Sequence, residues 1–138
     1  MTIDSDEFVA SFEATTLPKD LWTHEAHVRV AWWYARTRPF PESLDAMRAG
    51  ILRYNEVIGV ETTADSGYHE TVTVAWIRIM HDLVRGRSMG DDFDDFCTSH
   101  PDVLDKRILL RNYTPQRLMS PEARAAFVEP DLSPLPSP

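Results

Sequence analysis

Three histidines and one glutamate have the side chains and the spacing of a metal centre. His24 and His27 stand three positions apart, so on a helix they lie one turn apart on the same face. His69 and Glu70 are adjacent at the start of a second segment with helical periodicity. Three imidazoles from two facing helices leave an open coordination position, as catalytic metal sites do. The pattern therefore predicts a mononuclear site in which His24, His27 and His69 hold Fe, Cu or Zn.

Glu70 is expected to serve this site either as a fourth ligand or as the general base for a metal-bound water. Adjacent residues of a helix point about 100° apart, which favours a place at the rim of the site. Asn55 interrupts an apolar helical face, and Arg111 is a candidate anchor for an anionic substrate or a cap for a neighbouring helix. The predicted substrate-binding residues are Asn55, Tyr68, Thr73 and Arg111. We predict a metal-dependent enzyme that acts on a small molecule, with redox and zinc-type chemistry both open.

Two other classes of protein fit the same residues. A single inward histidine is usually a core residue bonded to a carbonyl group, so the metal prediction depends on the set of three. A helical binding module would instead hold a small molecule through hydrogen bonds to neutral histidines. A structural or interaction domain, pairing as a homodimer through Trp32 and Trp33, is the third reading. His81 falls on a polar boundary and His100 precedes a proline, so neither is expected in the site.

The elements that position these residues are all predicted to be helices. Strand signals are nearly absent, and turn signals cut the chain into short helical blocks. The expected helices span about residues 5–13, 24–37, 41–58, 68–84, 102–112 and 121–128, with a short acidic helix opened by Ser88 or Asp91. The fourth of these should bury His69 and turn Thr71 to solvent. We predict an all-α irregular bundle of about four longer helices plus short ones, one domain over residues 1–138, with an extended Pro-rich tail at 129–138.

The amino-acid composition limits the classes of molecule that this chain is expected to bind. The chain has 22 acidic and 14 basic residues and a net charge of −8, which disfavours nucleic acid and anionic membranes. No apolar run is long enough to span a membrane, and the N-terminal residues lack the order of a signal peptide. Cys97 is the single cysteine, so neither a disulfide nor a cysteine-based zinc site is expected. We therefore expect a cytoplasmic protein whose partner is a small molecule.

Two short motifs carry a resemblance. Residues 22–28 read W-T-H-E-A-H-V and residues 68–73 read Y-H-E-T-V-T, with Tyr-Asn at 54–55 and Y-T-P-Q-R-L at 113–118. Together they resemble a family of small uncharacterised bacterial all-helical proteins with W-T-H-x-A-H and Y-H-E-T-x-T motifs. The resemblance covers about residues 8–135. It implies that the three histidines and Glu70 occupy motif positions, and it implies no chemistry.

Overall fold

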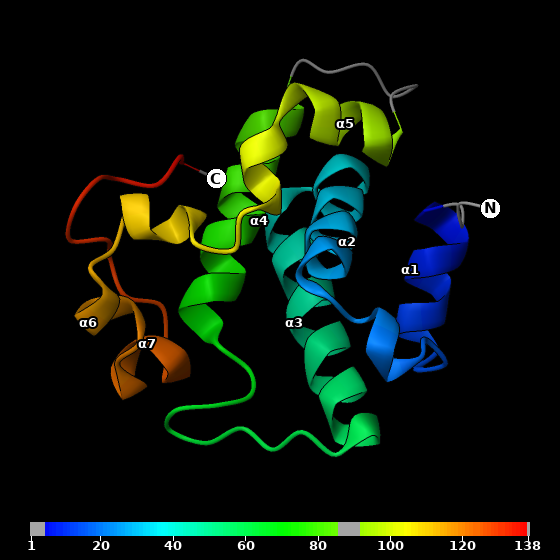
Figure 1. Ribbon diagram of the computed structural model, residues 1–138, viewed down its shortest axis with the longest axis horizontal. Helices are drawn as coiled ribbons and strands as arrows, with labels where there is room; N and C mark the ends of the chain where they lie inside the picture. The colour runs from blue at the N-terminus through cyan, green and yellow to red at the C-terminus, as the bar shows by residue number, and fades with distance from the viewer. Residues whose placement is uncertain (1–4, 86–91, 138) are drawn as a thin grey trace.

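The structure is a computed structural model that describes residues 5–85 and 92–137 (Figure 1). This part of the chain contains seven α-helices and no β-strand, which confirms the predicted all-α class. The four longer helices are α1 (Ser5–Glu13), α2 (His24–Thr37), α3 (Phe40–Ile58) and α4 (Glu70–Val84). The shorter elements are α5 (Phe93–Ser99), α6 (Pro115–Leu118), α7 (Pro121–Ala125) and the 3-10 turns η1 (Lys19–Leu21), η2 (Pro101–Leu104) and η3 (Ile108–Arg111).

Helices α2, α3 and α4 pack against one another and form the centre of the bundle. Figure 1 shows α1 on one flank of this group, α5 across one end, and α6 and α7 on the opposite flank. The chain therefore surrounds the α2–α3–α4 junction on several sides. All the predicted site residues except Arg111 lie on these three helices or directly before α4.

Local signals explain the bounds of α2 and α3. The side chain of Thr23 caps α2 by accepting a hydrogen bond from the backbone N–H of Ala26 at 3.2 Å. Pro41 stands in the first turn of α3, where a missing N–H is tolerated. Gly59 ends α3 in the left-handed conformation, with φ of +80°. The predicted bounds of α2 agree with the structure, and those of α3 agree within one residue.

Helix α4 begins two residues later than predicted. Its N-cap is His69, which has an extended backbone and whose ring Nδ1 accepts a hydrogen bond from the backbone N–H of Val72 at 3.2 Å. An imidazole lone pair thus replaces the usual Ser, Thr or Asp oxygen, and helical periodicity does not reveal this use of a histidine. His69 is consequently half-buried at the helix start and does not lie within the helix.

Thr71 corrects the prediction for the outer face of α4. It was expected to face solvent, but it is completely buried. Its hydroxyl donates to the carbonyl of Ala126 at 3.0 Å and accepts from the N–H of Val128 at 3.1 Å. The segment after α7 therefore covers this face of α4 and ends the last helix at Ala125, earlier than the predicted residue 128. Periodicity within one helix cannot show that a distant segment packs over it.

Helix α5 begins at Phe93 with Asp92 as its cap, while the predicted openers Ser88 and Asp91 lie outside the described residues. The aromatic rings of Phe93 and Phe96 pack on Trp32, with ring centroids 5.5 and 6.1 Å from its own. Only 3% of Trp32 is exposed. Trp32 is therefore a core residue within the described part of the chain, and homodimer formation stays a prediction.

The C-terminal tail follows α7 without further helix through residue 137. The side-chain amide of Asn112 donates to the carbonyls of Ser133 and Pro134 at 3.1 and 3.2 Å, and Leu135 is buried. The tail is thus attached to the bundle by both polar and apolar contacts. Within residues 5–85 and 92–137, no helix combines the length and the apolar character needed to cross a membrane.

Candidate functional site

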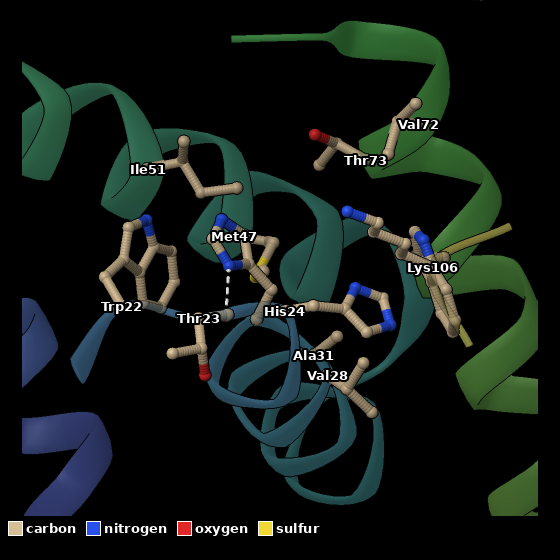
Figure 2. Close-up of a pocket in the computed structure, with 12 residues that line it drawn as sticks. Trp22, Thr23, His24, Val28, Ala31, Met47, Ile51, Val72, Thr73 and Lys106 are labelled. Carbon is tan, nitrogen blue, oxygen red and sulfur yellow. Dashed lines mark hydrogen bonds between the residues drawn. The ribbon is translucent and has the colours of Figure 1, made fainter. Parts of the chain in front are cut away.

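Two adjoining hollows lie where α2, α3 and α4 meet. The first has a volume of about 300 Å³ and mostly apolar walls, with His24, Val28 and Ala31 from α2 and Met47 from α3 (Figure 2). The second has a volume of about 440 Å³. The residues that line both are Trp22, His27, Ile51, Val72 and Thr73. We call the two together the histidine cavity.

The histidine cavity gathers six of the eight predicted site residues. The first hollow is lined by His24, His27 and Thr73, and the second by His27, Thr73, Asn55, Tyr68 and His69. The periodicity of separate helices therefore pointed to one common interior. Glu70 and Arg111 are not among the residues that line either hollow.

His27 presents an unused nitrogen to this cavity. Its ring Nδ1 lies 2.7 Å from the carbonyl oxygen of Thr23. Because a carbonyl can only accept, Nδ1 carries the ring proton. The imidazole also stacks on Trp22, with ring centroids 3.7 Å apart. Burial lowers the pKa of His27 to about 4, a shift opposed in part by the Thr23 hydrogen bond and assisted by the nearby His24.

His27 is consequently a neutral imidazole near pH 7, with a lone pair on Nε2. Within the described part of the chain, no group donates a hydrogen bond to that nitrogen. Nδ1 is held at the backbone of the α2 N-terminus, so Nε2 is the polar atom that His27 offers to a molecule in the cavity.

His69 differs because both of its ring nitrogens are engaged. Nδ1 accepts from the backbone N–H of Val72, and Nε2 donates to the carbonyl of Leu118 at 2.7 Å. Burial lowers the pKa of His69, which keeps the ring in the neutral form that this pairing requires. The imidazole ties the start of α4 to the end of α6. A metal ion on His69 would have to replace one of these two hydrogen bonds.

Only one ring nitrogen of His24 forms a hydrogen bond within the described residues. Its Nε2 lies 3.1 Å from the carbonyl of Val103, to which it donates, and its ring edge meets Trp76. Over the described residues, no three His, Cys, Asp or Glu side chains lie close enough together to hold a metal ion. His24, His27 and His69 thus surround one cavity without forming a three-ligand group as they stand. The metal site stays a prediction.

Glu70 is held by two partners, Arg48 and the cavity residue Tyr68. Arg48 of α3 donates to both carboxylate oxygens, at 3.0 and 2.5 Å, and the hydroxyl of Tyr68 donates to one of them. The Arg48 guanidinium lowers the pKa of the Glu70 carboxyl, which makes it a weaker proton acceptor. The cluster connects α3 to the start of α4. The role of Glu70 as base or ligand stays a prediction, and its contacts assign it a structural task.

Among the predicted substrate-binding residues, Asn55 has the clearest polar group to offer. Only 9% of Asn55 is exposed, and its side-chain amide forms no hydrogen bond within the described chain. The hydroxyl of Thr73 donates to the carbonyl of His69 at 2.9 Å while lining both hollows. Arg111, by contrast, is exposed and pairs with Asp102 at 3.0 Å, so the structure does not bring it to the cavity.

Three cavity residues were missed by sequence reasoning. Trp22 precedes the predicted helix and lines both hollows. Lys106 lines the first hollow and Lys19 the second. Both lysines stand in turns or 3-10 segments, where helical periodicity makes no prediction about direction. The sequence offered one signal for these two positions: Lys19 and Lys106 are the only lysines in the chain.

No protein-family model, curated protein or solved structure matches this chain. The family resemblance carried by the motifs around His24 and His69 therefore stays a prediction.

Proposed function

We propose that this chain binds a small, largely apolar organic molecule in the histidine cavity, and that His27 Nε2 accepts a hydrogen bond from it. The observation that carries the proposal is a pair of polar groups without a partner in residues 5–85 and 92–137, His27 Nε2 and the Asn55 amide, at a cavity with mainly apolar walls. Such a mixture of apolar walls and a few polar groups is typical of small-molecule sites.

Asn55 supplies the second polar group. Its side-chain amide forms no hydrogen bond within the described residues, and it lies on a helical face that is otherwise mainly apolar. The amide is not completely enclosed by protein, so it is accessible to a bound molecule and would help to orient it.

Binding is better supported than proton transfer. An efficient general base has a pKa near the working pH, and the pKa of His27 is about 4. A ring with so low a pKa accepts hydrogen bonds but takes a proton poorly near pH 7. This favours a binding module that uses neutral histidines.

The proposal predicts that filling the cavity blocks binding. Val72 lines both hollows, so Val72→Phe should place a ring at their junction. In an NMR screen of small aromatic and aliphatic compounds that carry an O–H or N–H group, compounds should shift the amide signals of Trp22, His27 and Asn55. Val72→Phe should weaken their binding about tenfold or more, equivalent to about 1.4 kcal/mol.

The matched control is Val57→Phe, at an α3 position that is 59% exposed. It adds the same group away from the cavity and should leave binding unchanged. Thermal melting of both variants establishes that they are folded. A screen in which no compound shifts cavity residues, or in which folded Val72→Phe binds as well as the native protein, contradicts the proposal.

A metal-dependent enzyme is the second candidate. It is supported by His24 and His27, which line one hollow and each keep one ring nitrogen outside their backbone hydrogen bonds. It predicts near-stoichiometric metal in protein purified without an affinity tag, lost in His27→Ala. His81→Ala should keep the metal, because His81 contacts Ser43 and does not line the cavity. Failure to load Fe, Cu or Zn after reconstitution would rule this candidate out.

A further inference from the structure

The two lysines of this chain both lie at the histidine cavity. Lys106, in the turn between η2 and η3, lines the first hollow, and Lys19, in η1, lines the second. Several arginines are engaged elsewhere, as Arg48 is with Glu70 and Arg111 with Asp102. Neither lysine ammonium group has an ion pair or hydrogen bond within the described residues. The cavity therefore has two available cations in a chain whose net charge is −8.

The surroundings of Lys106 indicate which kind of molecule suits its ammonium group. Its neighbours in the first hollow include Val28, Ala31 and Met47, which offer no charge to pair with an ammonium group. Figure 2 shows its side chain extending over the hollow, in this view between Thr73 and His24. An ammonium at the edge of an apolar hollow is suited to a molecule with an apolar body and an anionic end.

His27 lies on the side of the first hollow away from Lys106. Figure 2 shows Trp22 and Lys106 on opposite sides of the hollow, and His27 stacks on Trp22. The acceptor His27 Nε2 is therefore separated from the Lys106 side by the apolar part of the cavity. Asn55 lies in the adjoining hollow, which His27 and Lys19 also line.

We propose that the ligand is a small amphipathic carboxylic acid. Its carboxylate pairs with Lys106, its apolar body lies against Val28, Ala31 and Met47, and a hydroxyl or N–H group at its other end donates to His27. This inference rests on the proposed function, because it names the chemical class of the molecule that the cavity binds. The chain has a net charge of −8, which repels an anionic ligand at long range. Binding of a carboxylic acid therefore requires a positive side chain at the site itself.

Three probes test the carboxylate and the hydroxyl separately: 3-(4-hydroxyphenyl)propanoate, its primary amide, and 3-phenylpropanoate. Titration calorimetry or NMR titration of the full chain should show the hydroxy acid binding about fivefold tighter than its amide, the scale of a solvent-accessible ion pair. Removing the hydroxyl should also weaken binding. Lys106→Met should abolish the preference for the acid over the amide.

Arg107→Met is the charge-matched control. It removes the same charge from the adjacent residue, whose side chain is 76% exposed and pairs with Asp105. It should preserve the preference for the acid, whereas a loss equal to that in Lys106→Met would show a general electrostatic effect and overturn the inference. Loss of the preference in Lys19→Met instead of Lys106→Met would overturn the proposed orientation.

The failure of this inference is distinguishable from failure of the proposed function. An amide that binds as tightly as the acid, and is blocked by Val72→Phe, overturns the acid assignment and supports the cavity as a binding site. If none of the three probes binds, the acid assignment is overturned. The compound screen with Val72→Phe and Val57→Phe then decides the proposed function independently.

Discussion

The free energy of unfolding should fall by about 3 kcal/mol because of His27 as the pH is lowered from 6.5 to 4. The pKa of His27 is about 4 in the folded protein, compared with an ordinary value of 6.5. Between these values the unfolded chain binds a proton that the folded chain excludes, so acid favours unfolding. Above pH 6.5 both states hold His27 neutral, and its contribution to stability is fully present. His69 and His81, whose pKa values burial also lowers, act in the same direction.

Urea denaturation at a series of pH values between 4 and 7 measures this dependence, and NMR titration of the His27 ring gives its pKa directly. His27→Phe keeps an aromatic ring beside Trp22 and removes the titrating group. Its unfolding free energy should vary with pH by about 3 kcal/mol less than that of the native protein over the same range. An unchanged pH dependence in a folded His27→Phe variant would contradict the half-buried, neutral state of His27, and with it the acceptor role proposed for Nε2.

His69→Ala should lower the free energy of unfolding by about 2–4 kcal/mol at pH 7, in protein treated with a chelator. The change leaves two groups without their partners, the N–H of Val72 and the carbonyl of Leu118. An unsatisfied buried group costs about 1–3 kcal/mol, and loss of a helix cap typically about 1 kcal/mol. The two bonds join the start of α4 to the end of α6, so the effect should reach the C-terminal elements.

His69→Asn separates the two bonds. Asparagine is a good N-cap but has a shorter side chain, so it should restore the bond to Val72 N–H and not the one to Leu118. Its stability should fall between that of His69→Ala and that of the native protein. If His69→Ala is destabilised only in the metal-loaded state, His69 is a metal ligand, and the structural role argued here is wrong.

The histidine cavity shows where the predicted direction of side chains agrees with the structure. Periodicity placed His24, His27 and Asn55 on the inner faces of α2 and α3, and all three line the histidine cavity. This worked because the direction of a side chain along a helix depends on its position alone. The contacts of Glu70 could not be predicted, because its partner Arg48 lies 22 positions earlier in the chain and no local pattern pairs the two.

By itself, the sequence determined the helical class and the bounds of α2. Thr23 and the apolar spacing of residues 24–37 act within one or two turns, so their effect is the same in any surrounding fold. Only the tertiary structure decided what each histidine does. The carbonyls that engage His24 and His69 belong to Val103 and Leu118, which are 79 and 49 positions away. An imidazole has only two nitrogens, and the backbone groups that packing brought beside them determined which one each ring still offers to a ligand.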